Sequence, residues 1–201
     1  MRTPERSEQI GRENRLGRLT TAIAAVAAGL SLATSDLLRH VSPTVDDVAC
    51  ETAAAYAINA VDFVKFGSIG LAVFMLARLE WLGISALAKR VAMVGAVASI
   101  MTGLANAVEH CAHLEVVGLV YVVSLMIGLA ATAWFGILLG RSRETSRWMG
   151  WAIALGTLAF WFGAEEGWGP PVDATMWIAV GVGLLIAKSE SPNRTGHPTH
   201  P

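Results

Sequence analysis

Charged residues are scarce in this sequence. Asp, Glu, Lys and Arg make up 15% of the 201 residues, whereas they average about 25% in soluble domains. Hydrophobic residues make up 54%, and the mean hydropathy is +0.52. Because the apolar residues also gather in long runs, this composition argues against a soluble domain and predicts a protein whose partner is the lipid bilayer.

Blocks of like charge are also missing. The formal net charge is −1, and no acidic or basic run is long enough to form a nucleic-acid-binding tail. We therefore expect no nucleic-acid partner.

Recognisable catalytic motifs are missing as well. The sequence contains no HExxH motif and no CxxC pair, the signatures of zinc proteases and of thiol oxidoreductases. No histidine lies within an apolar run, which disfavours haem held between two helices. The sequence motifs therefore leave open whether the protein is an enzyme.

The sequence does contain six apolar stretches, and these predict an all-α integral membrane bundle of six transmembrane helices. A helix rises 1.5 Å per residue, so about 20 residues cross the hydrocarbon core. The transmembrane domain is predicted over residues 19–188, with spans at about 19–38, 52–77, 91–108, 116–140, 148–164 and 174–187.

Polar segments flank this domain and interrupt it. Residues 1–18 carry five arginines and no apolar repeat, which predicts a mobile cytoplasmic tail, and residues 189–201 are predicted to form a disordered one. A cleaved signal peptide is the alternative for the first apolar stretch, although the spans that follow favour a retained anchor. Pro170-Pro171 predicts a turn before the last span, because a helix cannot continue through these prolines.

Basic and acidic residues separate between the two sides of this bundle. With the N-terminus inside, 13 of the 15 basic residues fall on inner segments, and the exceptions are Arg39 and Lys65. Acidic residues collect instead at the outer turns. The positive-inside rule therefore predicts cytoplasmic termini and a multi-pass protein of the cell membrane. The abundance of Arg, Ala and Gly suggests the plasma membrane of a bacterium.

The densest cluster of chemically capable side chains lies at the outer end of the third span. Glu109, His110 and His113 stand there at helical spacing, and imidazole with carboxylate would suit a transition metal such as zinc, copper or iron. The alternative is a solvated loop with two titrating histidines.

Two cysteines exclude a disulfide-rich module but permit one bridge. Cys50 and Cys111 fall at two outer turns, so we predict a disulfide between them in an oxidising extracytoplasmic space. Closing a loop of this length is worth up to roughly 4 kcal/mol. Free thiols, or thiolates in the metal site, are the alternatives.

Polar side chains also lie within the second span. Asn59, Asp62 and Lys65 share one helical face at a spacing of three. Charged groups at this depth cost about 2.5–3.5 kcal/mol each on insertion scales, and they are tolerated when paired or facing a wet cavity. Two interpretations remain equal: a proton or ion pathway, and a structural Asp–Lys pair that neutralises itself.

Small residues are expected at helix contacts, because lipid offers no hydrophobic drive for helices to associate. Gly136 and Gly140 have the GxxxG spacing, which we interpret as close helix packing within the chain rather than a dimer motif.

Three classes of function follow. The first is an accessory or structural membrane component, acting with a partner subunit or as a homo-oligomer, and we place it ahead because no catalytic signature is present. The second is a proton- or ion-coupled transporter that uses Asp62 and Lys65. The third is a metal-binding enzyme or sensor with an outer site at His110 and His113.

Overall fold

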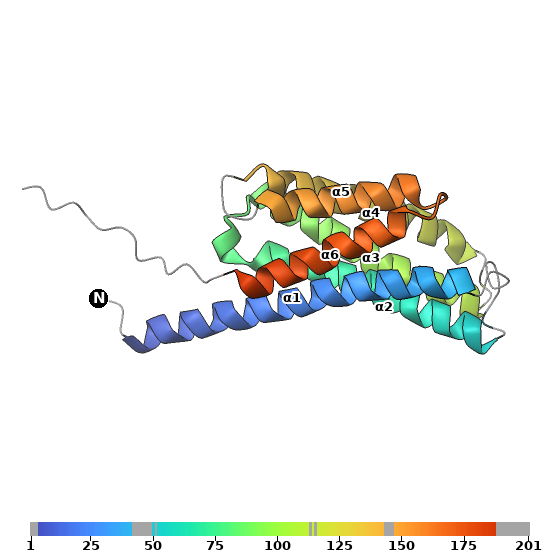
Figure 1. Cartoon of the computed structure of the whole chain (residues 1–201), viewed down its shortest axis with the longest axis horizontal. Helices are drawn as coiled ribbons and strands as arrows, with labels where there is room; N and C mark the ends of the chain where they lie inside the picture. The colour runs from blue at the N-terminus through green and yellow to red at the C-terminus, as the bar shows by residue number, and fades with distance from the viewer. Residues whose placement is uncertain are drawn as a thin grey trace, which may run out of the picture.

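The computed structural model describes residues 4–41, 50, 52–112, 114, 116–142 and 147–187, with only the backbone for residues 4–14 and 80. Six α-helices make up this part of the chain, and it contains no strand (Figure 1). In order they are α1 (Pro4–Val41), α2 (Ala53–Arg78), α3 (Ala86–Ala112), α4 (Val116–Gly140), α5 (Arg147–Gly163) and α6 (Gly169–Ile186). A single 3₁₀ turn, η2 (Glu80–Leu82), lies between α2 and α3. The prediction of an all-α six-helix bundle is confirmed.

Five of these helices are long and apolar enough to cross a membrane. The sixth, α5, has 17 residues, which span about 25 Å and so lie at the short end of what a bilayer needs. Large apolar side chains cover the outward faces, most densely on α4, where Leu119 is 72% exposed. These faces suit lipid, as a helical membrane protein requires.

The helices form a closed ring. Each helix packs against the next one in the chain, and α6 packs against α1 to complete the circle. Because connected helices run in opposite directions, the end of α6 lies beside the middle of α1 (Figure 1), where Arg18 donates a hydrogen bond to the carbonyl of Ala187. We call this the terminal end of the bundle. The opposite end, where a disulfide joins Cys50 to Cys111, is the disulfide end.

Three helix starts differ from the sequence prediction, and the simplest difference is that α3 begins at Ala86, five residues before its predicted span. Helix α1 begins at Pro4, fifteen residues before the predicted span, so residues 4–18 are helical. Helix α6 begins at Gly169 and contains Pro170 and Pro171 in its first turn. The predicted turn through these prolines is wrong, because the first backbone N–H groups of a helix have no partner within it, and proline is tolerated there.

The third helix ends later than predicted. It runs to Ala112, so that Glu109, His110 and Cys111 belong to its last turn rather than to an open loop. The following helix begins four residues later, at Val116. The cluster predicted at a turn is therefore partly held on a helix.

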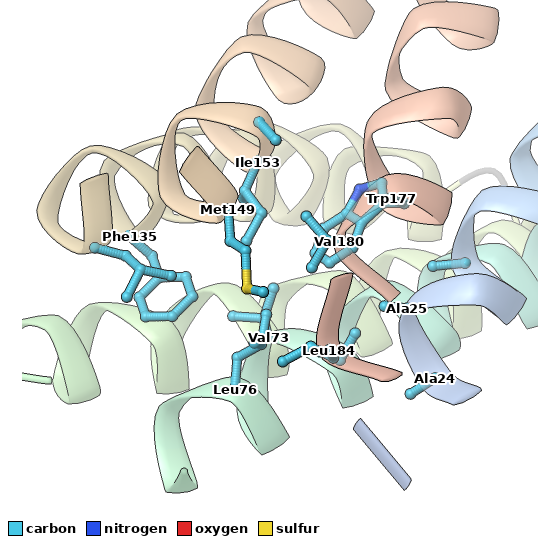
Figure 2. Packing of buried hydrophobic residues seen from close by; sticks show 14 of the residues in the cluster. Ala24, Ala25, Val73, Leu76, Phe135, Met149, Ile153, Trp177, Val180 and Leu184 are labelled. Atoms are coloured by element: carbon cyan, nitrogen blue, oxygen red, sulfur yellow. The ribbon is translucent and has the colours of Figure 1, made fainter. Parts of the chain in front are cut away.

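Apolar packing fills the terminal half of the ring. Figure 2 shows Met149 and Ile153 of α5 directed toward Val73 and Leu76 of α2, with Phe135 beside them. All five side chains are at most 3% exposed. This half of the bundle is closed by a dense hydrophobic core.

Glycine allows the closest helix contact, between α4 and α5. A Cβ atom built on Gly136 would lie 2.6 Å from the backbone nitrogen of Ala154, and one on Gly150 would lie 2.7 Å from the carbonyl oxygen of Gly136. Only a residue without a Cβ fits these positions. The GxxxG spacing of Gly136 and Gly140 thus serves packing within the chain.

Candidate functional site

A buried network of charged side chains surrounds Asp62 of α2. The side chain of Asp62 is 2% exposed. Its Oδ1 accepts hydrogen bonds from Lys65 Nζ at 2.5 Å and from Ser35 Oγ at 2.6 Å, while its Oδ2 accepts one from Arg39 Nη2 at 2.7 Å. We call these four residues the Asp62 network. It ties α1 to α2, because Ser35 and Arg39 stand one helical turn apart on α1 and face the same carboxylate.

Lys65 is the member of this network that lies furthest along α2 from the disulfide end. Its side chain is 8% exposed, and its Nζ also lies 3.4 Å from Ser35 Oγ and 4.6 Å from the centre of the Phe66 ring. Asp173 of α6 is close enough to act on its charge. Lys65 is therefore paired with Asp62 on its own helix, and its charge is within electrostatic reach of Asp173 on α6.

The network reaches the surface on one side. The Arg39 side chain is 45% exposed and stands two residues before the end of α1 at the disulfide end. In the described residues, buried polar side chains otherwise lie near the middle of the bundle or toward that same end, with Thr21 as the exception. Charge and polarity thus extend inward from the disulfide end and stop at the apolar core.

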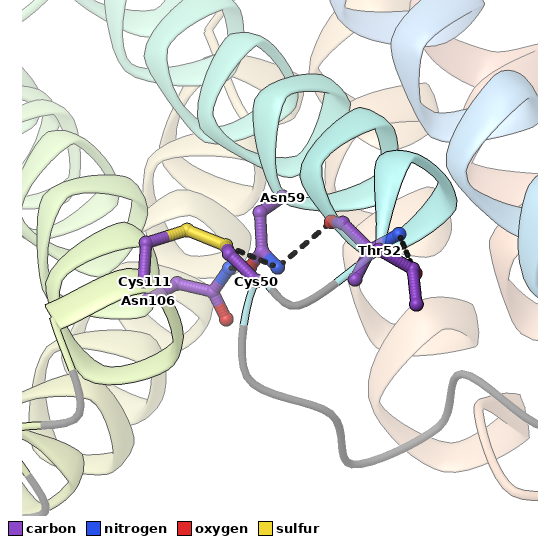
Figure 3. Close-up of a disulfide and its surroundings, with 6 residues drawn as sticks. Cys50, Thr52, Asn59, Asn106 and Cys111 are labelled. Atoms are coloured by element: carbon purple, nitrogen blue, oxygen red, sulfur yellow. Dashed lines mark hydrogen bonds between the residues drawn. A yellow bond between two sulfur atoms is a disulfide. The ribbon is translucent and has the colours of Figure 1, made fainter.

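A second polar cluster lies next to the disulfide (Figure 3). Asn106 of α3 donates a hydrogen bond of 3.0 Å to Asn59 Oδ1, and Asn59 Nδ2 in turn donates to the carbonyl of Ala55 and approaches Cys50 Sγ at 3.5 Å. The backbone N–H of Cys50 donates to the carbonyl of His110 at 3.0 Å. The disulfide and the amide pair together fasten α2 to α3. The structure pairs Cys50 with Cys111 as predicted.

A small cavity lies inside the ring, and all six helices line it. Its volume is about 20 Å³, which is room for roughly one water molecule. Most of its lining is apolar, and the polar part consists of four hydroxyl groups, one carboxyl group and the indole N–H of Trp177. The lining residues include Leu32 (α1), Phe66 (α2), Ser99 and Thr102 (α3), Thr132 (α4), Thr157 (α5), and Asp173 and Trp177 (α6).

Two buried oxygens at this cavity have no hydrogen-bond partner within the described part of the chain. They are Asp173 Oδ1 and Thr132 Oγ1, and each residue is 3% exposed. Trp177, one turn further along α6, is close enough to hydrogen-bond to the Asp173 carboxyl group, but Oδ1 stays without a donor. Buried polar groups are rarely left unpartnered in proteins, because each one costs about 1–3 kcal/mol.

The predicted outer metal site is only partly described. Glu109 and His110 lie in the last turn of α3, and a Cβ on Gly118 of α4 would meet the Glu109 carboxylate. His113 lies outside the described residues. Among those that are described, no three His, Cys, Asp or Glu side chains come together as metal ligands do, so this site stays a prediction.

The three intramembrane residues predicted from the second span take two different roles. Asp62 and Lys65 bond to each other, whereas Asn59 bonds to Asn106 near the disulfide. The sequence reasoning missed Ser35, Arg39, Asp173 and Thr132. Arg39 could have been found from the sequence, because it is the one Lys or Arg at the acidic outer turns and follows Ser35 by one helical turn.

The fold and the site define an all-α helical bundle with apolar helices long enough to span a membrane and a buried ionic site between α1 and α2. The chain matches no protein-family model, no curated protein and no solved structure.

Proposed function

We propose that this protein is an ion-coupled membrane protein, a small transporter in which the Asp62 network takes up a proton or another small cation from the disulfide end. The observation that carries this proposal is the buried Asp62–Lys65 pair, joined to the half-exposed Arg39 on one side and within electrostatic reach of Asp173 on the other. Ionisable groups inside a bundle are costly, and chains of them mark ion and proton routes.

The arrangement of polar and apolar residues supports uptake from one side. A self-contained structural ion pair would need only one carboxylate and one ammonium group, whereas Lys65 here bonds to Asp62 and is also within electrostatic reach of Asp173. Toward the terminal end, the route meets the apolar core around Leu76 and Phe135. A coupling site that opens to one side at a time is what alternating access requires.

The first experiment measures proton flux into liposomes that contain the purified protein, with an internal pH-sensitive dye and an imposed membrane potential. Asp62→Asn keeps the shape of the side chain but removes its charge, so we expect flux to fall by about a hundredfold, as for removal of a positioned proton-transfer group. Asp62→Glu should restore part of the flux. The matched control is Asp36→Asn on α1, which should leave the flux unchanged.

Unchanged flux in well-folded Asp62→Asn protein would overturn this function. Folding is checked by size-exclusion chromatography in detergent, and Lys65→Met provides a second variant that removes the other half of the pair. Should neither variant reduce flux, the accessory role in a larger membrane assembly becomes the better hypothesis, and co-purification of a partner subunit would test it.

A further inference from the structure

We infer that the central cavity is a binding site for one small monovalent cation, sodium or a proton, and that Asp173 is its counter-charge. The inference deepens the proposed function, on which its role in transport rests, because it names the ion and a second site for it. The two unpartnered oxygens, Asp173 Oδ1 and Thr132 Oγ1, carry the argument.

The chemistry of the lining selects a hard cation. Every polar side chain around the cavity is oxygen-bearing except Trp177, and the lining adds the hydroxyls of Ser99, Thr102 and Thr157 to the two unpartnered oxygens. Oxygen ligands suit hard cations, and thiolate or imidazole, which would favour a transition metal, is not among them. A buried carboxylate oxygen without a donor is also expensive unless a cation or a proton meets it.

The charge and size of the site select a monovalent ion. Asp173 is the one carboxylate at the cavity, whereas sites for divalent ions commonly gather several. Lys65 acts on Asp173 from α2, with Asp62 and Arg39 behind it, and the cavity-lining residues of α3, α4 and α5 carry no charge. A volume of about 20 Å³ admits a species the size of one water molecule.

Glycines pack directly against oxygens of the cavity. A Cβ on Gly156 of α5 would lie 2.6 Å from Asp173 Oδ1, one on Gly95 would lie 3.3 Å from Thr132 Oγ1, and one on Gly128 would lie 3.4 Å from Ser99 Oγ. Three glycines on three helices therefore stand where a larger residue would press on the oxygens. Gly156→Ala is consequently a steric probe of the site that leaves the carboxyl group in place.

The test is thermal unfolding of the full-length protein in detergent, with sodium chloride compared with choline chloride at equal ionic strength. Sodium at roughly ten times its Kd should raise Tm by about 3 °C. Asp173→Asn, Thr132→Val and Gly156→Ala should lose this shift. Glu165→Gln, an exposed acid at the same end of the bundle, is the matched control and should keep it.

A second arm replaces sodium by protons. If the cation is a proton, Tm responds to neither salt but rises between mildly alkaline and mildly acidic pH, and this rise is lost in Asp173→Asn. Both results support the site and identify its ion. The inference is overturned if the wild-type protein shows neither response, or if all three cavity variants retain it.

This assay also separates the inference from the proposed function. Binding in detergent involves no transport, so a sodium response without flux would uphold the cavity site and reject the transporter. The opposite result is flux that depends on Asp62, is unaffected by Asp173→Asn and Gly156→Ala, and comes with no cation response. That result would uphold the transporter and reject the cavity site.

Discussion

At the residue scale, the site combines one ion pair along α2, Asp62–Lys65, with short polar contacts between helices. Asp62 accepts hydrogen bonds from two residues of α1, and Asn59 accepts one from α3. Inside a bilayer such groups cannot form hydrogen bonds with water, so they need partners within the protein. This need is what fixes α1, α2 and α3 in register at the disulfide end.

The amide pair gives a direct test of this idea. Asn106→Ala leaves Asn59 Oδ1 without its donor, so we expect a loss of about 1 kcal/mol in the free energy of unfolding, the scale measured for hydrogen bonds between membrane helices. A double-mutant cycle with Asn59→Ala, followed by denaturation in detergent, checks it. If the two single losses add fully in the double variant, the pair is not coupled and the inferred contact is wrong.

Sequence reasoning found only part of the site, and the reason lies in distance along the chain. Asp62 and Lys65 stand three residues apart, so helical spacing alone placed them on one face. Asp173 lies more than a hundred residues further on, and no local pattern shows that α6 packs beside α1. Its position was also assigned to a turn, because the proline pair before it predicts a helix break as readily as a helix start.

At the scale of the elements, small residues determine how closely the helices approach. Gly136 and Gly150 allow the backbones of α4 and α5 to touch, and Gly29 and Gly181 have the same role between α1 and α6. The six apolar runs could be located from hydropathy, but their ends could not. The predicted boundaries moved by up to fifteen residues, because polar residues such as those of 4–18 are equally compatible with helix and coil.

A substitution at the close contact between α4 and α5 should separate the effect of packing on stability from the effect of helix propensity. Gly150→Leu places a large side chain against α4, so we expect destabilisation by about 2 kcal/mol, the usual cost of overpacking. Gly67→Leu is the matched control, since a Cβ there would meet nothing within 4 Å, and leucine is the better helix former. Thermal unfolding in detergent measures both, and equal stability of the two variants would contradict the contact.

At the scale of the whole molecule, the ring has two unlike halves. The half near the disulfide holds the Asp62 network, the amide pair and the central cavity, whereas the terminal half is filled by apolar side chains such as Val73, Phe135 and Leu184. Charge follows the same division. Among the described residues from 15 onward, the basic ones at helix ends lie mostly at the terminal end, and the acidic ones lie at the disulfide end except for Glu80.

This division predicts how the molecule sits in the membrane. By the positive-inside rule, the terminal end should face the cytoplasm, which would place the disulfide in the oxidising space where such bonds persist and open the Asp62 network to the outside. Single cysteines at two exposed positions test it: Glu165→Cys at the disulfide end and Arg141→Cys at the terminal end.

In intact cells, a membrane-impermeant maleimide should label Glu165→Cys at once and Arg141→Cys only after the membrane is permeabilised. The parent protein is the control, because Cys50 and Cys111 are joined and should not react. The opposite labelling pattern would place the network toward the cytoplasm. Asp62 and Asp173 would then take up cations from inside the cell. The disulfide would also have to form in a reducing compartment, which is the less favourable arrangement.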